Sequence, residues 1–334
     1  MLLERLAPVE PGSAPLCPAR LPRPVPGPGE VLVEVSACGV CHTELDEIEG
    51  RTPPPRLPVV PGHEIVGRVV ARGKGASRHA EGTRVGIGWI HDSDGSELEN
   101  LSPRFRATGR DVNGGYAEYV TVPERCACPV PGTWSDVEAA PLLCAGAVGY
   151  RALCRAGIAD GDVLGLTGFG GSAHIVLQLA RHLYPASPVY VFARGEDAQA
   201  FALEQGADWS GATDEAPPQA PRAIIDTTPA WRPVLAALAA LRPGGRLVIN
   251  AIRKEAVDRE LLAGIDYARH LWLEKELTTV ANVTAADIAA FLPLAAEAGI
   301  RPRVEVYPLA EANRALVDLK TGNVRGAKVL RVRA

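Results

Sequence analysis

The stretch Pro61-Gly62-His63-Glu64-Ile65-Val66-Gly67 sets an imidazole beside a carboxylate, between a proline-glycine turn and an apolar run. Two cysteine-bearing segments lie elsewhere in the chain, Cys38-Gly39-Val40-Cys41-His42-Thr43 and Leu143-Cys144-Ala145-Gly146. Thiolate and imidazole are preferred zinc ligands, and a catalytic zinc keeps three protein ligands and one open position. Because these residues are scattered, a buried thiol and an unrelated histidine are the alternative to a metal site.

The composition indicates a globular protein with two domains. A chain of 334 residues is long for one hydrophobic core. Hydrophobic residues make up 47%, and the net charge of -4 provides no basic surface for nucleic acid. No apolar run approaches the roughly 20 residues that span a bilayer, and no signal-peptide pattern is present, so we expect a cytoplasmic protein without membrane or nucleic-acid partners. Seven unevenly spaced cysteines suit thiols or metal ligands better than disulfides.

The first part of the chain is typical of short strands and loops. Alternating apolar and polar residues predict a half-buried strand at Glu30–Ala37. Further strands are expected at 65–71, 82–90 and 116–122, and a short helix at 42–48. The polar segment 91–113 has few apolar anchors and indicates an excursion from the core. The Ala- and Leu-rich segment 135–156 predicts a helix.

From Gly161 onward, strands alternate with helices, which implies a parallel sheet with helices on both faces. After the first of these strands, Gly168-Phe169-Gly170-Gly171-Ser172-Ala173 opens a helix, which is the context of a dinucleotide fingerprint. Gly168 permits the tight turn, Gly170 lets the backbone approach a pyrophosphate, and Ala173 keeps helix and strand close. We therefore predict that the coenzyme is bound by Gly168, Gly170, Gly171 and Ala173. The alternative is an ordinary glycine-rich turn between a strand and a helix.

The next strand indicates which coenzyme is preferred. An NAD site usually has a carboxylate at the end of this strand, where it binds the ribose hydroxyls. Here the strand ends Phe192-Ala193-Arg194-Gly195. Because a guanidinium suits a 2′-phosphate, Arg194 favours NADP(H) over NAD(H). Glu196 and Asp197 would bind the ribose if the strand ended later.

Several motifs resemble those of a known enzyme family. Gly62-His63-Glu64-x-x-Gly67, with Gly73 and Ala76 at matching spacing, is similar to the zinc alcohol dehydrogenase signature. Cys38–Thr43, Gly114-Gly115-Tyr116-Ala117-Glu118-Tyr119 and Ala140–Gly146 resemble further marks of that family, in order along nearly the whole chain. The chain thus resembles the zinc-containing alcohol dehydrogenase branch of the medium-chain dehydrogenase/reductase superfamily.

The resemblance implies an α/β fold with two domains. A GroES-like, mainly-β catalytic domain would span residues 1–147, and a Rossmann doubly wound parallel sheet would span 148–283. Residues 284–334 would return to the catalytic domain.

The resemblance also implies roles for individual residues. Cys41, His63 and Cys144 would be the catalytic zinc ligands, and Glu64 would approach the metal transiently during ligand exchange. Thr43 matches the hydroxyl that hydrogen-bonds the substrate alcohol and starts a proton relay; a helix cap is its alternative role.

Three more residues match the coenzyme and substrate sites of the family. His42 matches a residue that touches the coenzyme pyrophosphate, and Lys328 occupies a position where a cation often does the same. Trp89 matches an aromatic residue that narrows the substrate pocket, and plain core packing is its alternative role.

The sequence departs from the family pattern in three places. The family often holds a structural zinc with four closely spaced cysteines, whereas His91–Asn113 contains none and Ser102 stands where the last is expected. We therefore predict one zinc per chain. Asp46 replaces a histidine that often ends the proton relay; it either takes that proton or is a solvated acid, and we favour the second. Val148 replaces a threonine that often contacts the nicotinamide.

The expected enzyme is a zinc-dependent oxidoreductase. It would transfer a hydride between a primary alcohol or its aldehyde, aromatic ones included, and NADP(H) or NAD(H). The alternatives are a zinc-less, non-catalytic dinucleotide-binding relative and a dedicated polyol or enoyl reductase. Following the family, residues 277–283 are expected to pair two Rossmann sheets in a homodimer or homotetramer.

Overall fold

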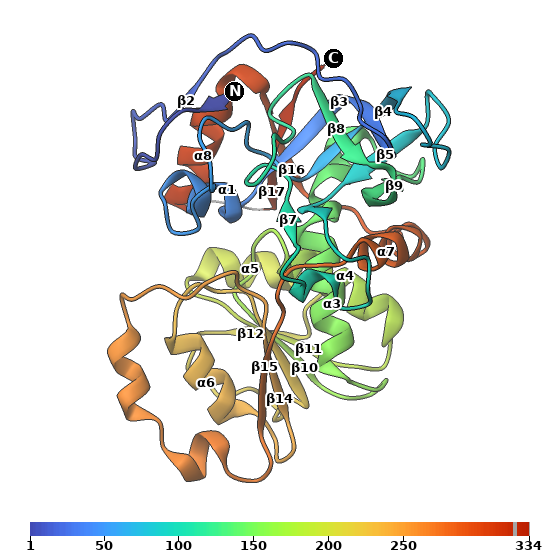
Figure 1. The fold of residues 1–334 in the computed structure, drawn as a ribbon. Coiled ribbons are helices and arrows are strands. Elements are labelled where there is room, and N and C mark those ends of the chain that lie inside the picture. Colours follow the sequence, from blue (N-terminus) through green and yellow to red (C-terminus); the bar gives the residue numbers. More distant parts are fainter. Residues whose placement is uncertain (323–325, 334) are drawn as a thin grey trace. The chain divides into compact units, whose positions relative to one another are not determined.

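The computed structural model describes residues 1–322 and 326–333, and the chain divides into two compact units (Figure 1). The first unit comprises Met1–Ala147, Val283–Ala296 and Arg301–Ala334. The second comprises Val148–Asn282 and Glu297–Ile300. The chain therefore starts in the first unit, passes through the second and returns, and after the return only Glu297–Ile300 belong to the second unit.

A seven-stranded sheet forms the centre of the first unit, in the order β16-β17-β3-β4-β5-β9, with β8 also paired to β3. Its pairs are antiparallel except for the parallel pair β16 and β17. The bounds are β3 Glu30–Val40, β4 Ile65–Arg72, β5 Arg84–Ile87, β8 Tyr119–Pro123, β9 Ala127–Pro129, β16 Val304–Pro308 and β17 Ala327–Arg331.

The central strand β3 extends beyond the predicted Glu30–Ala37 to Val40 and is buried along most of its length. Neighbouring strands contact it on both edges, and its valines enter the main hydrophobic core. Shorter elements surround the sheet. They are α1 His42–Ile48, α7 Ala285–Glu297, α8 Ala312–Thr321, β1 Leu2–Leu3, β2 Leu16–Cys17, β6 Ile90–Asp92 and β7 Arg106–Ala107.

The helix predicted over 135–156 is broken into three pieces, so that prediction was wrong in detail. α2 spans Asp136–Ala139, a 3-10 turn spans Ala140–Leu143, and α3 spans Ala145–Ala156. Pro141 lies in the 3-10 turn and cannot donate a backbone hydrogen bond. No single described helix is long and apolar enough to cross a membrane, although the bent pair formed by these pieces passes on length and composition.

The second unit contains a fully parallel six-stranded sheet, in the order β12-β11-β10-β13-β14-β15. Its strands are β10 Leu164–Thr167, β11 Val189–Phe192, β12 Trp209–Gly211, β13 Ala223–Asp226, β14 Arg246–Ile249 and β15 Glu276–Thr279. Its helices are α3, α4 Ala173–Leu183, α5 Glu196–Glu204 and α6 Arg232–Ala240.

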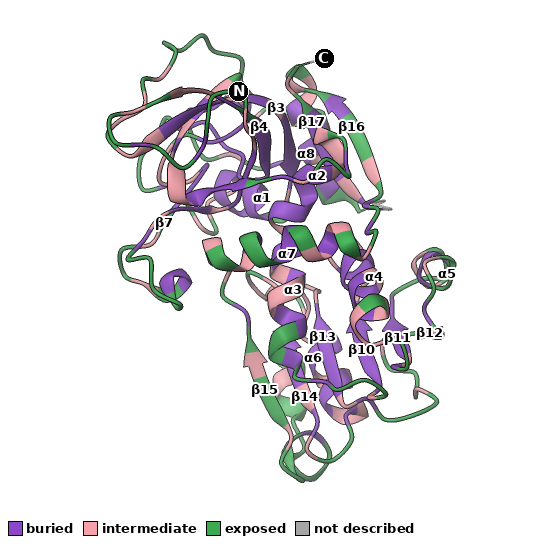
Figure 2. Ribbon diagram, turned by 90° about the vertical axis from the view of Figure 1, so that its right-hand side faces the viewer, coloured by how far each residue is buried: buried purple, intermediate pink, exposed green. Residues whose placement is uncertain are grey.

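Burial differs between the middle and the edge of this sheet. Figure 2 shows β10, β11 and β13 as buried, whereas β15 is largely exposed. Buried apolar strands of this kind are typical of a parallel sheet covered by helices. The predicted Rossmann architecture is confirmed, and β12, too short to be noticed in the sequence, completes it.

Candidate metal centre and coenzyme loop

Cys41 stands at the junction between β3 and α1. Its backbone is extended, whereas the next residue begins the helix. The backbone N–H of Cys41 donates to Glu44 Oε2 at 2.8 Å, so the Glu44 side chain caps the helix that follows. This cap holds the Cys41 side chain at the first turn of α1.

His63 and Glu64 are placed by tight packing around glycines. Gly62 has φ +102°, and a Cβ there would lie 2.4 Å from the Tyr116 ring, so only glycine fits. A Cβ on Gly39 would lie 1.6 Å from Glu64 Oε2. The space that Gly39 leaves open therefore receives the Glu64 carboxyl.

Cys144 lies at the break between the 3-10 turn and α3. Its φ of -126° and ψ of -75° are not helical. A continuous helix through this position would direct the side chain differently. The break, which the sequence did not predict, therefore orients this thiol.

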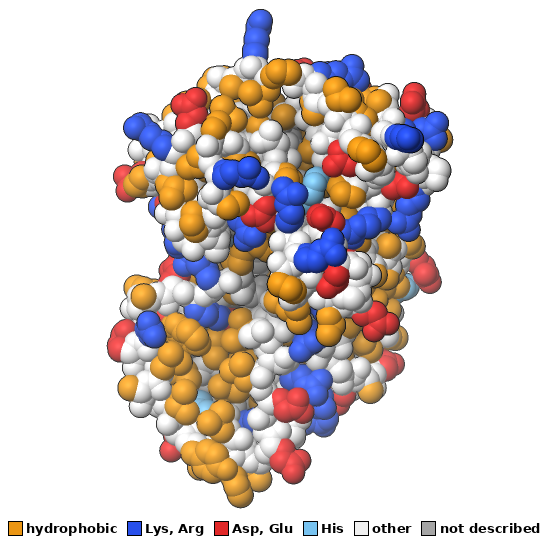
Figure 3. Space-filling view, in the orientation of Figure 1, with side chains coloured by type: hydrophobic (Ala, Val, Ile, Leu, Met, Phe, Trp, Pro, Cys, Tyr) orange, Lys and Arg blue, Asp and Glu red, His pale blue; other side chains and the backbone are white. Residues whose placement is uncertain are grey.

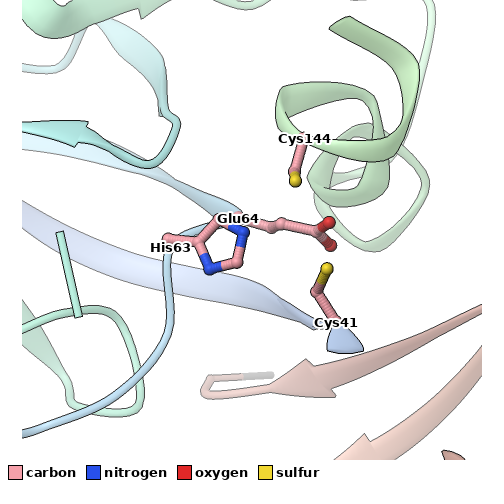
Figure 4. A group of neighbouring side chains, drawn as sticks. All are labelled: Cys41, His63, Glu64 and Cys144. Atoms are coloured by element: carbon pink, nitrogen blue, oxygen red, sulfur yellow. The ribbon is translucent and has the colours of Figure 1, made fainter. Parts of the chain in front are cut away.

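The four side chains point toward one another (Figure 4). One ligand atom from each of Cys41, His63, Glu64 and Cys144 lies within 4.8 Å of all the others. His63 is fully buried, with Nδ1 2.5 Å from Glu44 Oε1. Its other nitrogen, Nε2, is buried with no hydrogen-bond partner among the described residues. Two sulfurs, an unpaired imidazole nitrogen and a carboxylate within this radius fit a zinc ion.

The electrostatics of the group favour a cation. The hydrogen bond with Cys144 lowers the pKa of Cys41 well below its usual range, in spite of burial. Although burial acts in the opposite direction, the Glu44 carboxylate raises the pKa of His63 well above its usual range. Burial and the Cys41 thiolate raise the pKa of Glu64. A thiolate and a carboxyl that share a largely buried site gain from a bound metal ion.

The other predicted residues of α1 differ in their surroundings. Thr43 is buried, with Oγ1 3.6 Å from Cys41 Sγ, whereas His42 is exposed. Asp46 is 2% exposed and pairs with Arg51 Nε at 2.6 Å. The preferred interpretation of Asp46 as a solvated acid was wrong, because Arg51, five residues later, returns to neutralise it.

Lys328 is buried in the described part of β17, opposite Val40. Its Nζ lies 2.6 Å from Glu305 Oε2 and 2.9 Å from the Tyr307 hydroxyl. The charge of Lys328 is thus balanced within its own sheet.

Two acids of α1 that the sequence patterns did not predict to be functional are Glu44 and Glu47. Glu44 is fully buried against His63, and Glu47 is 1% exposed and accepts a hydrogen bond from Trp89 Nε1 at 3.3 Å. Residues three apart share a helix face, which was the available signal. Burial, with Glu44 nearby, raises the pKa of Glu47 well above its usual range.

The glycine loop of the second unit follows β10, at the point where the strand order reverses. Gly168 has φ +75°, and a Cβ on Gly170 would meet nothing within 4 Å. Ala173 is fully buried at the start of α4, and the His174 ring bonds the Gly170 carbonyl at 2.9 Å. The turn is fixed by this hydrogen bond, and nothing blocks access to the backbone at Gly170. Such a turn at the carboxyl edge of a parallel sheet fits a dinucleotide pyrophosphate.

The next strand, β11, ends at Phe192 as predicted, and the exposed Arg194 lies just beyond it. Glu196 and Asp197 belong to the first turn of α5, after Gly195. The tip of the strand therefore carries a cation and no acid.

Comparisons with known proteins agree with this geometry. Residues 27–132 match the alcohol dehydrogenase GroES-like domain. The chain is 42% identical over 339 residues to a probable alcohol dehydrogenase AdhA of Mycobacterium tuberculosis, covering 98% of this chain and 95% of the relative. A crystal structure of an NAD-dependent alcohol dehydrogenase matches with a TM-score of 0.85 at 25% identity, over 99% of both chains.

A second solved structure contains NADP. This zinc-binding dehydrogenase of Sinorhizobium meliloti, bound to NADP, matches with a TM-score of 0.82 at 25% identity, over 93% of this chain and 94% of that one.

Proposed function

The chain belongs to the zinc-containing alcohol dehydrogenase family of medium-chain dehydrogenases/reductases, and from this premise we propose that its substrates are primary alcohols and their aldehydes, aromatic ones included. The enzyme is a zinc-dependent alcohol dehydrogenase that uses NAD(P). We assign the metal and substrate chemistry to residues 1–147 and 284–334, and coenzyme binding to 148–283. The observation that carries the proposal is the buried group of Cys41, His63, Glu64 and Cys144.

The metal site would be held by two thiolates and the His63 Nε2 atom. Zinc bound there supplies Lewis acidity toward an alcohol or carbonyl oxygen, and NAD(P) supplies the hydride acceptor or donor. One oxygen of Glu64 lies within 4.8 Å of the other three ligand atoms, so Glu64 is the residue suited to exchange at the open position. Glu44 holds the His63 ring so that Nε2, and not Nδ1, faces the other ligands.

Thr43 is the residue suited to take the proton from the substrate hydroxyl. It is buried beside Cys41, and a hydroxyl can accept one hydrogen bond while it donates another. We assign the next acceptor to Asp46, three residues later on α1. The Arg51 guanidinium beside it favours the charged carboxylate, so Asp46 would pass the proton on rather than keep it.

Coenzyme binding is assigned to the glycine loop of Gly168, Gly170, Gly171 and Ala173, with the exposed His42 as a further candidate for the pyrophosphate. Lys328 is the other candidate, and it would have to exchange its partner Glu305 for the phosphate. The exposed guanidinium of Arg194, beyond β11, favours NADP(H) over NAD(H).

Metal analysis and kinetics test the proposed function. Purified enzyme should hold tightly bound zinc and oxidise 1-propanol and benzyl alcohol faster than polyols such as sorbitol. Cys41→Ser should lose both zinc and activity, whereas Cys17→Ser, at an exposed cysteine outside the metal group, should keep both. Full activity of Cys41→Ser would refute a zinc enzyme, and a polyol preference would refute the substrate class.

We propose one zinc per chain, because ion pairs anchor the segment 91–113, in which members of the family often hold a second, structural zinc. Arg125 binds Asp92 Oδ1 at 2.7 Å and Glu99 Oε2 at 3.1 Å. Glu99 also accepts from the backbone N–H of Ala285 at 2.8 Å. Glu99 is nearly buried, so these bonds substitute for a metal as the link between the segment and its own unit.

We propose a homodimer, by itself or within a tetramer, formed through the edge strand β15. Edge strands with unpaired backbone groups invite pairing with another chain. Large apolar residues near this edge are exposed, and Figure 3 shows orange side chains gathered over this region of the second unit. They are Tyr267, Leu271, Trp272, Leu273 and Leu277.

A further inference from the structure

Trp89 is held by three side chains of the first unit, which we call the Trp89 clamp: Glu47, Phe105 and Arg110. Trp89 Nε1 donates to Glu47 Oε1 at 3.3 Å. The Phe105 ring centroid lies 5.5 Å from that of Trp89, and Arg110 Cζ lies 5.2 Å from the Trp89 ring centroid. A ring held by a hydrogen bond, an aromatic contact and a cation has one preferred position.

The clamp is joined to the metal site through α1 and through His63. The ring centroids of Trp89 and His63 are 6.2 Å apart. Glu44 and Glu47 lie on the same face of α1, and the first holds His63 while the second holds Trp89. One short helix therefore orients both a metal ligand and the aromatic ring beside it.

The burial of the Glu47 carboxyl is energetically unfavourable, which a purely structural position would not require. It is 1% exposed, and its Oε2 atom is buried with no hydrogen-bond partner among the described residues. A buried oxygen without a hydrogen-bond partner destabilises the folded protein. Such a cost is typical of a side chain retained for a functional site.

We propose that Glu47 is a positioning residue that fixes Trp89 and thereby limits the bulk accepted at the carbinol carbon of the substrate. The proposal rests on the proposed function, in which Trp89 lines the substrate pocket. A fixed indole leaves room for a primary alcohol and excludes a substituent on the reacting carbon. A loosened indole would give way to that substituent.

The experiment compares kcat/KM for 1-propanol and 2-propanol in zinc-loaded enzyme. The primary-to-secondary ratio should be high in the wild type, because exclusion of one methyl group is worth about tenfold or more. Glu47→Leu should lower the ratio about tenfold, with the change mainly in KM for 2-propanol. Glu47→Gln keeps an oxygen that accepts from Trp89 Nε1 and should stay within about threefold of the wild type.

A double-mutant cycle with Trp89→Ala separates positioning from a general structural effect. Trp89→Ala should lower the ratio, and Glu47→Leu added to it should change the ratio no further. A further drop in that background, or an unchanged ratio in Glu47→Leu alone, would overturn the inference. If Trp89→Ala leaves the ratio unchanged, the assignment of Trp89 to the pocket fails first. Zinc content and thermal unfolding of each variant show that it is folded.

Discussion

Glu44 Oε1 lies 2.5 Å from Nδ1 of His63, and both side chains are completely buried. The second Glu44 oxygen accepts from the backbone N–H of Cys41, so one carboxylate holds two metal ligands in place. Groups that orient a metal-bound histidine contribute to metal affinity as well as to ring orientation.

We expect Glu44→Ala to weaken zinc binding about 10- to 100-fold. The physical reason is that the His63 ring loses its anchor and the first turn of α1 loses its cap. Competition with a chelator of known affinity measures the change. Glu49→Ala, just after the same helix, removes an acid that pairs with Arg51 and Lys320, neither of which is a zinc ligand. It is the control and should bind zinc as the wild type does. Equal zinc affinity in both variants would contradict the prediction.

Thiol alkylation should report the occupancy of the site. Cys17 and Cys154 are exposed and should react at pH 8, whereas burial raises the pKa of Cys126 to about 12 and that of Cys128 to about 11. Below these values both buried cysteines are protonated thiols and react slowly.

Removal of zinc with a chelator should add Cys41 to the labelled cysteines, because a bound metal shields its thiolate. Cys144 should follow more slowly, because its hydrogen bond with Cys41 and burial raise the pKa of the metal-free thiol. Mass spectrometry of digested protein identifies each labelled position. The same labelling before and after chelation would argue against zinc ligation by these two residues.

Arg194→Ala should raise KM for NADP about 10- to 100-fold, which corresponds to the loss of a charged hydrogen bond of about 1.5–3 kcal/mol. KM for NAD should change little, because NAD has no 2′-phosphate. Steady-state kinetics with both coenzymes provide the test. A wild-type preference for NAD, or an equal loss with both coenzymes, would reverse the assignment.

Arg125→Met should lower the free energy of unfolding by about 1–3 kcal/mol, because it leaves the nearly buried Glu99 without its charge partner. At high salt the loss in free energy of unfolding should fall to half or less, because Arg125 is partly exposed and salt screens its charge. Urea denaturation measures it, and Arg104→Met, at an exposed position of the same segment, should have little effect. Two zinc ions per chain in the purified enzyme would contradict the role given to these ion pairs.

Leu277→Asp should shift the protein from dimer to monomer, since it places a charge on the exposed edge strand β15. Light scattering after gel filtration measures the mass in solution. Leu203→Asp, on α5 of the same unit and similarly exposed, is the matched control and should remain dimeric. A monomeric wild type, or dimerisation that survives Leu277→Asp, would refute the proposed interface.

Much of this protein was readable from local sequence patterns. Strand and helix alternation after Gly161 predicted the parallel sheet, since burial on both faces leaves continuous apolar runs. The motifs around Cys41, His63 and Cys144 predicted the metal ligands through resemblance to a family. These features depend on residues close together in the chain or on an ordered set of motifs.

Other features depend on which side chains meet after folding. The helix over 135–156 looked continuous, yet it breaks at Cys144, and that break orients the thiol. Asp46 was predicted to be a solvated acid, but in the structure it is buried and paired with Arg51. Glu44 and Glu47 looked like ordinary helix acids, but they are buried against His63 and Trp89, which lie 19 and 42 residues away. The sequence alone predicted the zinc ligands and the glycine loop that we assign to the coenzyme. Tertiary packing alone decided which acids hold those ligands, because burial and partners arise only when distant segments come together.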